Sequence, residues 1–426
     1  MTAETIFALA SGRPPAAISI IRVSGQFAHK AGVQLAGTLP EARVAAVRTL
    51  RGRDGSLLDD ALVLRFDGPA SSTGEDVVEF QCHGGRAVVD AVLRELDGIE
   101  GLRVAKPGEF TRRAFENGRI DLTEAEGLAD LIEAETESQR KAALAVAEGG
   151  LRRQVERWQG LTLQLSARAE AAIDYAEEDD VDVDSALSRD CDALAFELLS
   201  WLERPRIEPL KDGVRVVVAG PPNTGKSSLI NAVTGQDRAI VTEIPGTTRD
   251  HIEVPIALGG VPVLLTDTAG LRETEEVVER IGVERSKTLM ESADVLVWLG
   301  DPDQSPGHPR LLRVHSRADL PERAAAPAGS IAVSSRTGQG LATLLAQVGD
   351  MARSLLPSED AISLNRRQAS EVSEAHAALS AAGAASDFVL LAENLRAARS
   401  AFDRLTGRAG VEDVLDALFG RFCLGK

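Results

Sequence analysis

The stretch GPPNTGKS, residues 220–227, follows the apolar run VRVVVA, residues 214–219, and precedes the helical sequence SSLINAV. A glycine-rich loop that ends in Gly-Lys-Ser between a strand and a helix is the pattern of a P-loop. Backbone N–H groups of such a loop and the N-terminus of its helix hold phosphate oxygens. Lys226 adds a positive charge for the β- and γ-phosphates, and the Ser227 hydroxyl is a magnesium ligand. A glycine turn without a ligand is the alternative, and the flanking strand and helix argue against it. The loop residues expected to contact a nucleotide are Asn223, Thr224, Gly225, Lys226, Ser227 and Ser228.

Two segments downstream fit the same nucleotide. Asp267, in LLTDTAG, ends a second apolar run, and its carboxylate can hold the shell of the magnesium ion. Thr268, Ala269 and Gly270 follow it, and the Gly270 N–H can be offered to the γ-phosphate. Thr248, in PGTTRD, lies between the P-loop and this segment, where a switch loop adds a magnesium ligand. Taken alone, GTTRD is an ordinary turn, but between these two motifs it predicts a switch.

The segment SRAD, residues 316–319, indicates guanine as the base. GTPases recognise guanine with an Asn-Lys-x-Asp segment after a later strand, and SRAD follows the apolar run LLRVH. Asp319 can accept from the ring N–H and the exocyclic amine of guanine, a donor pair that adenine lacks. Arg317 can lay its stem over the base, whereas Ser316, in place of asparagine, reaches less far. The expected last base-contacting loop consists of Ser334, Ser335 and Arg336.

Leu271 follows DTAG at a position where many GTPases carry a glutamine that orients water. A leucine side chain has no group that can orient water. GTP hydrolysis must therefore depend on another side chain, a partner or an ion.

The overall composition is that of an ordinary globular protein. The chain has 426 residues, of which 44% are hydrophobic and 26% charged, and a formal net charge of −18. This acidic balance argues against a protein that coats nucleic acid nonspecifically, but leaves room for a local basic groove. The three cysteines, Cys82, Cys191 and Cys423, show no zinc-type spacing, which indicates free thiols in a reducing cytosol.

The N-terminal sequence MTAETIFALASG lacks a basic region followed by an apolar one, so a secretory signal is not expected. No apolar run is long enough to span a bilayer. We therefore expect a cytoplasmic protein without a membrane partner.

Four parts are expected along the chain, in an α/β plus all-α fold. Residues 1–118 read as mixed α/β, 119–208 as helical, 209–355 as alternating strand and helix, and 356–426 as helical again. One helical domain with an α/β domain inserted into it accounts for this order. Two separate helical domains are the alternative.

Local patterns predict several elements. Short β-rich runs lie at 17–23, 61–66 and 76–81, and helical spacing follows at 84–96. A capping box of Thr123 and Glu126 is expected to begin the first helical part. The acidic run 176–184 reads as a solvated turn, with a metal site as the less favoured alternative, and 205–212 reads as a linker.

With the P-loop, GTTRD and DTAG-Leu in order, the chain resembles the MnmE (TrmE) family of tRNA-modification GTPases. The segments IRVSG (21–25), GEDVVEFQCHGG (74–85) and PGEFTRRAFENGRIDLTEAEGLADLI (107–132) carry the resemblance, which covers essentially the whole chain. The family closes with Cys-x-Gly-Lys, and this chain ends Cys423-Leu-Gly-Lys. The implied fold is an N-terminal α/β folate-binding-like domain, a helical domain and an inserted Ras-like P-loop GTPase domain.

The resemblance implies an activity and partners. Family members form homodimers and act with the flavoprotein MnmG, which uses FAD and NADH, in a heterotetramer. Together they add an aminomethyl or carboxymethylaminomethyl group to ring carbon five of the wobble uridine of certain tRNAs. A folate, 5,10-methylenetetrahydrofolate or 5-formyltetrahydrofolate, carries the one-carbon unit. The N-terminal domain binds this folate and forms the dimer.

Site residues follow by matching motif positions. Folate contacts are implied for Arg22, Glu79, Arg119 and Lys426, with Arg119 standing where the family usually has lysine.

The resemblance implies a potassium ion in place of the missing glutamine. The ion would act when two GTPase domains meet across the dimer. Its ligands would be Asn223, Thr242, Ile244 and Thr247. Glu279, in EVVERIG, matches a glutamate that positions the attacking water, although spacing alone fits a helix-surface glutamate equally well. The residues expected to take part in catalysis are Lys226, Thr248, Glu279 and Cys423.

The C-terminal tail has its own pattern. An apolar stripe at helical spacing predicts a docked helix that ends near Gly420. From composition alone Cys423 reads as a small buried hydrophobe. The resemblance instead places its thiol near the folate, where a thiolate beside Lys426 would be the more reactive form. His83, in CHGG, reads as a turn histidine. The stripe consists of Val411, Val414, Leu415, Leu418 and Phe422.

Two other functions also fit parts of the sequence. A GTP-switched ribosome-assembly factor shares GTTRD and DTAG-Leu, but such proteins usually carry a basic RNA-binding domain. A degenerate family member, weakened by Ser316, would bind GTP and ATP alike or neither.

Overall fold

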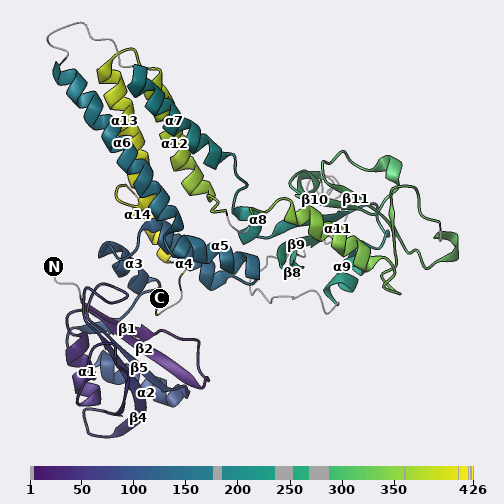
Figure 1. Ribbon diagram of the computed structural model, residues 1–426. Coiled ribbons are helices and arrows are strands. Elements are labelled where there is room, and N and C mark those ends of the chain that lie inside the picture. Colours follow the sequence, from purple (N-terminus) through teal and green to yellow (C-terminus); the bar gives the residue numbers. More distant parts are fainter. Residues whose placement is uncertain are drawn as a thin grey trace, which may run out of the picture. The chain divides into compact units, whose positions relative to one another are not determined.

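A computed structural model describes residues 4–175, 185–235, 253–267, 287–323, 325–358, 361–410, 412–420, 422 and 425. The chain forms two compact units, each with a sheet of its own (Figure 1). Unit 1 consists of Met1–Ala129, Val146–Leu163 and Arg399–Lys426, and unit 2 of Asp130–Ala145 and Gln164–Ala398.

The sheet of unit 1 has the strand order β3-β4-β5-β2-β1-β6. Neighbouring strands are antiparallel except for β1 and β6, which are parallel. Its strands confirm the three predicted β-rich runs with small shifts at the ends. They are β1 (Thr5–Leu9), β2 (Ile18–Ser24), β3 (Ala46–Arg51), β4 (Leu57–Phe66), β5 (Val77–His83) and β6 (Leu102–Val104).

The two faces of this sheet are covered differently. On one face Phe7, Ile21 and Phe80 pack in a core with α1 (Ala28–Ala36) and α2 (Arg86–Asp97). Successive side chains of a strand point to opposite faces. The other face carries Arg22 of β2 and Glu79 of β5, which are register partners, and a small cluster around Phe110 of α3 (Glu109–Glu116) packs Ile6 and Ala8 of β1 there.

Helices lie on both sides of the second sheet along the chain. In unit 1, Trp158 is fully buried and stacks on Phe402, with ring centroids 5.9 Å apart. In unit 2, α7 packs along α12, as Figure 1 shows. Helices before and after the second sheet in the chain therefore pack on one another. The helices are α4 (Leu122–Glu133), α5 (Glu137–Ala147), α6 (Gly150–Tyr175), α7 (Ser185–Leu202), α8 (Glu208–Lys211), α12 (Arg366–Gly383), α13 (Phe388–Thr406) and α14 (Glu412–Phe419).

The start of α4 differs from the prediction. Asp121, not Thr123, caps the helix: its Oδ1 accepts from the Glu124 N–H at 2.9 Å. Glu124, not Glu126, reaches back to the Asp121 N–H at 2.8 Å. The pattern of a capping box was correct but displaced by two residues, because aspartate caps a helix as well as threonine does.

Two other local predictions have different outcomes. The expected linker 205–212 contains a helical turn, α8. The acidic run 176–184 lies outside the described residues.

The sheet of unit 2 has the order β12-β11-β10-β7-β9-β8. All neighbours are parallel except β8 and β9. This is the Ras-like α/β arrangement expected from the sequence, with β7 in the interior of the sheet. Its elements are β7 (Val214–Ala219), α9 (Lys226–Thr234), β8 (Glu253–Leu258), β9 (Val261–Asp267), β10 (Val295–Trp298), η1 (Pro302–Gln304), β11 (Leu311–Ser316), η2 (Pro321–Arg323), β12 (Ile331–Val333) and α11 (Leu341–Arg353).

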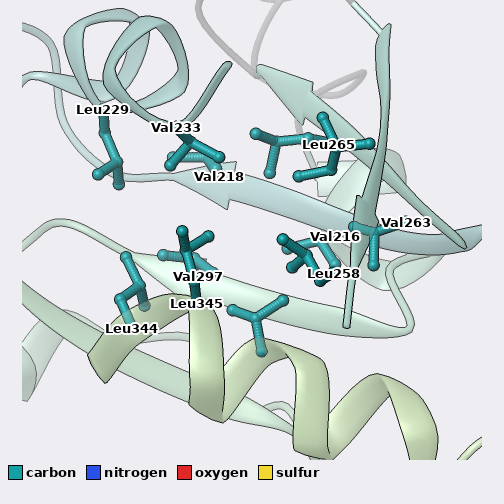
Figure 2. Close-up of a pocket in the computed structure, with 12 residues that line it drawn as sticks. Val216, Val218, Leu229, Val233, Leu258, Val263, Leu265, Val297, Leu344 and Leu345 are labelled. Atoms are coloured by element: carbon teal, nitrogen blue, oxygen red, sulfur yellow. The ribbon is translucent and has the colours of Figure 1, made fainter. Parts of the chain in front are cut away.

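A small cavity lies in the core of unit 2, where β7, β8, β9 and β10 face α9 and α11 (Figure 2). Its volume is about 20 Å³, and Val218, Leu229 and Val348 are among its aliphatic lining residues. This is room for a single water, but an apolar lining offers a water no hydrogen bonds. The cavity is therefore a packing void, and the nucleotide must bind elsewhere.

Within the part of the chain that the structure describes, none of the helices has both the length and the apolar character to cross a membrane.

Candidate functional site

The predicted P-loop leaves the carboxyl end of β7 and leads directly into α9. Gly220 has φ 149°, and a Cβ there would lie 3.1 Å from the Leu299 carbonyl carbon after β10. Asn223 and Gly225 also have positive φ, 61° and 93°. Gly225 is the N-cap of α9, with no side-chain cap on the helix. The first-turn N–H groups, which carry the positive end of the helix dipole, are therefore available to an anion.

Lys226 lies inside this loop. Its side chain is largely buried, with the residue 7% exposed, and its Nζ donates to the carbonyl oxygens of Gly220 and Pro221, both at 2.9 Å. Burial lowers the pKa of the Lys226 ammonium, while the charge of Asp267 opposes that shift. A cation held by backbone oxygens in a dry loop suits a phosphate, because low local polarity strengthens the attraction.

Ser227 and Asp267 are brought together from different elements. Ser227, on the first turn of α9, donates from its Oγ to Oδ2 of Asp267, at the end of β9, over 2.7 Å. Asp267 is buried. A hydroxyl and a carboxylate at this spacing are the oxygen ligands that Mg²⁺ prefers. Ser228 is exposed on the same helical turn.

The SRAD segment begins with the last residue of β11, Ser316, and lies against the P-loop. The Ser316 Oγ donates to the Thr224 carbonyl oxygen at 2.7 Å, and an Arg317 guanidinium N–H donates to the Asn223 carbonyl oxygen at 2.7 Å. Residues more than ninety positions apart in the chain thus join the two loops. This contact brings the expected base site next to the expected phosphate site.

Asp319 is held from two sides. Its Oδ1 accepts from the Ser334 hydroxyl at 2.7 Å, and its Oδ2 pairs with the Arg336 guanidinium at 3.1 Å. The hydrogen bond from Ser334 lowers the pKa of the Asp319 carboxyl, and the charge of Arg336 adds to the effect. Asp319 is therefore an oriented, ionised acceptor, as reading guanine requires. Ser335 lies between its two partners in the chain.

Ten of the candidate residues lie outside the described residues, so the structure leaves their roles untested. They are Thr242, Ile244, Thr247, Thr248, Thr268, Ala269, Gly270, Glu279, Cys423 and Lys426.

In unit 1 the structure pairs two of the four candidate folate residues. The Arg22 Nε lies 2.8 Å from Glu79 Oε1, and the Arg22 guanidinium lies 5.6 Å from the centre of the Phe110 ring. Arg119 is exposed in the loop after α3. A Cβ on Gly74, which has φ 81°, would lie 3.3 Å from the Arg119 Cγ. Arg119 therefore packs beside the loop that leads into β5.

The end of the chain returns to the first strand. Gly425 has φ 95°, and a Cβ there would overlap the carbonyl oxygen of Leu9, at the end of β1. Only glycine fits this conformation and this close approach. The preceding residue of β1, Ala8, is the register partner of Arg22. Gly425 therefore lies close to the end of β1, the strand that pairs with the Arg22-bearing strand β2.

The predicted apolar stripe docks the last helix. Leu415 and Phe422 are buried, and Val414 and Leu418 pack against the same cluster. Val411 lies outside the described residues, and α14 ends at Phe419, directly before Gly420, as expected. Phe419 was not among the predicted residues, although it follows Leu415 by one helical turn. It is buried, and the centre of its ring lies 6.4 Å from the centre of the Phe115 ring.

The two described cysteines are poor nucleophiles. Burial raises the pKa of the Cys82 thiol to about 12 and that of the Cys191 thiol to about 11. Nearby carboxylates, Asp59 and Asp192 among them, add to these shifts. Both residues are thus structural rather than reactive.

His83 is not the turn residue that the sequence predicted. It is the last residue of β5, and its Nδ1 lies 2.7 Å from Oδ1 of the mostly buried Asp59. The Asp59 carboxylate also accepts from the His83 backbone N–H at 2.8 Å. Asp59 comes from the neighbouring strand β4, so spacing along the sequence gave no sign of this pair.

Arg113 is a buried residue that sequence reasoning missed. It forms ion pairs with Glu75 at 3.0 Å and with Glu109 at 3.2 Å, and Glu75 in turn accepts from the Ser24 hydroxyl at 2.7 Å. The network fixes the loop before β5 to α3 and β2. Removing Arg113 would take away the ion-pair partner of Glu75, and breaking a buried pair in this way typically costs about 3–5 kcal/mol.

A P-loop after an interior strand, an aspartate at the end of the neighbouring strand and a second aspartate in a loop joined to the P-loop define a P-loop GTPase. The family model described as the MnmE helical domain matches residues 122–423, and that described as the GTP-binding protein TrmE N-terminus matches residues 5–119. The chain belongs to the MnmE family of tRNA modification GTPases.

Relatives named tRNA modification GTPase MnmE match along the full chain. Those of Erythrobacter litoralis and Novosphingobium aromaticivorans are 52% and 50% identical, over 99% of this chain and 100% of each relative. That of Rhizobium meliloti is 45% identical over 100% of both. The solved G domain of the T. maritima FeoB iron transporter is 26% identical over 33% of this chain and 98% of its own. Its TM-score of 0.24 supports no conclusion about this chain.

Proposed function

We propose that this chain is a potassium-activated GTPase that acts, with a flavoprotein partner, in modification of the tRNA wobble uridine. The nucleotide part of this proposal is supported by the P-loop, the Ser227–Asp267 contact and the oriented Asp319. Lys226 binds the β- and γ-phosphates. Ser227 and Thr248 ligate magnesium, which neutralises phosphate charge when bound.

We also propose that potassium replaces the water-orienting glutamine that Leu271 cannot provide. Asn223, Thr242, Ile244 and Thr247 would offer it oxygen ligands, and Glu279 would position the attacking water. Of these residues Asn223 is described, and it lies in the P-loop with a φ of 61°. Held by these residues as two GTPase domains of a homodimer meet with GTP bound, a potassium ion would supply positive charge to the transition state.

GTP turnover is therefore expected to be faster in potassium than in sodium, by about ten-fold or more, because a lost electrostatic contact to the transition state costs at least that factor. The measurement is phosphate release at equal ionic strength in the two chlorides. Sodium and potassium differ in size, not charge, so equal rates would remove the potassium ligands from the proposal.

The proposed role in tRNA modification depends on the C-terminal residues of the chain. The contact between Gly425 and Leu9 supports a site in which Cys423 and Lys426 join Arg22, Glu79 and Arg119. The guanidinium of Arg22 and the ring of Phe110 are suitable neighbours for a flat, polar folate ring. The folate, 5,10-methylenetetrahydrofolate or 5-formyltetrahydrofolate, supplies a one-carbon unit when bound.

The proposed setting is the cytoplasm, and the proposed assembly is a homodimer joined to the MnmG flavoprotein, with tRNA as the substrate. The proposed domains are an N-terminal domain at 1–118, a helical domain formed by 119–208 and 356–426, and an inserted GTPase domain at 209–355.

The test is mass spectrometry of tRNA nucleosides from a strain that lacks this protein, with and without the native chain supplied in trans. The native chain is expected to restore the aminomethyl or carboxymethylaminomethyl group on the wobble uridine. If the uridine is the same with and without the chain, the modification proposal fails. A ribosome-assembly factor is then the next candidate, and ribosome profiles of the same strains would show its defect.

A further inference from the structure

The hydrogen bond made by Ser316 limits what this residue can offer to a bound base. Its Oγ lies 2.7 Å from the Thr224 carbonyl oxygen, and the residue is 7% exposed. A carbonyl oxygen only accepts hydrogen bonds, so the Ser316 hydroxyl is the donor. Serine has one O–H proton, and here that proton is used within the protein.

A second hydrogen bond, made by the next residue in the chain, also joins the SRAD segment to the P-loop. Arg317, which has φ 59°, donates from its guanidinium to the Asn223 carbonyl oxygen at 2.7 Å. Ser316 and Arg317 belong to the SRAD segment, 316–319 (the base loop), and these two consecutive residues donate to two consecutive carbonyl groups of the P-loop. Ser316 and Arg317 therefore fix the position of the base loop relative to the phosphate site.

The chemistry of a purine nucleotide places the base between these groups. The five-membered ring carries the ribose, and the ribose carries the phosphates, so a protein group bonded to the P-loop is expected to lie nearest the five-membered ring. The polar atom on its edge is N7, an acceptor, which needs a donor from the protein. Asp319 is an acceptor and suits the opposite edge, which in guanine carries the ring N–H and the exocyclic amine.

We propose that Ser316 is a positioning residue that fastens the base loop to the P-loop and makes no hydrogen bond to N7 of the base. Base selection then depends on the six-membered-ring edge read by Asp319. The inference rests on the proposed GTP binding and specifies how the base is chosen.

The arrangement of Asp319 fits this division of roles. Ser334 holds one carboxylate oxygen and Arg336 the other, and Arg336 is 81% exposed at its side chain whereas Asp319 is 12% exposed. The carboxylate is thus fixed on its buried side and paired on its solvent side. Its orientation is set by the protein before a base arrives.

The experiment is titration of the full chain, with magnesium, against three nucleotides. GTP is compared with 7-deaza-GTP, in which N7 is replaced by C–H, and with inosine triphosphate, which lacks the exocyclic amine. We expect GTP and 7-deaza-GTP to bind within about two-fold of each other. Inosine triphosphate should bind about ten-fold more weakly, because a charged acceptor loses its partner.

Two variants of one residue sharpen the test. The amide of Ser316→Asn has two N–H protons, one for the Thr224 oxygen and one for N7. It should bind GTP about five-fold more tightly than 7-deaza-GTP, the effect of one hydrogen bond. Ser316→Ala removes the connection to Thr224 and should weaken both nucleotides by the same factor, which leaves their ratio near one.

Each contrary result has a distinct meaning. If the native chain prefers GTP to 7-deaza-GTP by about five-fold or more, N7 is read and the inference is wrong. An unchanged ratio in Ser316→Asn would contradict the placement of N7 beside Ser316, and with it the explanation that the bond to the Thr224 oxygen keeps this residue from reading the base. If the native chain binds none of the three nucleotides, the proposed function itself fails and the inference fails with it.

Discussion

Replacing Lys226 with alanine is expected to abolish GTP binding, with a loss of affinity of about 100-fold or more. The Lys226 ammonium is the buried cation of the P-loop and lies 2.9 Å from two of its carbonyl oxygens. Hydrogen bonds to charged groups contribute about 1.5–3 kcal/mol each, and a lysine in this position meets more than one phosphate oxygen. Alanine removes all of them together.

The measurement is equilibrium titration with a fluorescent GTP analogue, followed by phosphate release at saturating GTP. Lys287→Ala is the matched control, because Lys287 is an exposed lysine of the same unit with a 3.9 Å surface pair to Glu291. Its affinity should be unchanged, since such pairs contribute little. Normal affinity in Lys226→Ala would contradict the P-loop assignment. Thermal unfolding without nucleotide separates a binding defect from a folding defect.

The P-loop could be predicted because the residues that determine its backbone lie next to one another in the sequence. The strand β7 begins and ends where the apolar run 214–219 does, and α9 begins at Lys226. An apolar run, a glycine loop and a helical sequence each determine their own backbone, with little help from the rest of the chain. The same reasoning explains why Gly420 correctly marked the end of α14.

Contacts between distant segments could not be predicted in this way. Ser316 was identified as a departure from the usual asparagine, but nothing in the sequence indicated that its partner would be the Thr224 carbonyl oxygen, 92 residues away. The same holds for His83 with Asp59 and for Arg113 with Glu75. In each case the sheet or a helix brings the partners together, so the pairing depends on tertiary structure that spacing does not encode.

The displaced cap of α4 has a different cause. Asp121 and Thr123 are both good caps, and both have a glutamate three residues later, Glu124 and Glu126. The capping-box pattern therefore fits a helix capped by Asp121 and a helix capped by Thr123 equally well. Burial decides between them, since Leu122 and Thr123 are buried as the first residues of the helix.

Replacing Cys423 with serine is expected to lower the amount of modified wobble uridine in tRNA by about 100-fold or more. The affinity for GTP should be unchanged. A thiolate forms near neutral pH when a cation such as Lys426 is close, whereas a serine hydroxyl does not ionise there. Gly425 lies close to Leu9 of β1, on the strand beside the one that carries Arg22, which supports the proposed place of Cys423 at the folate site. The measurement is mass spectrometry of tRNA nucleosides from the deletion strain supplied with the variant.

Cys191→Ala is the matched control for this variant. Cys191 is fully buried in α7, and burial raises the pKa of its thiol to about 11, so it should support normal modification. The alanine leaves only a small cavity, and equal amounts of both variants in the cell should be verified. If Cys423→Ser restores the modified uridine as the native chain does, the thiol is dispensable. The buried Phe422 and the close approach of Gly425 would then assign the tail to packing of unit 1 rather than to chemistry.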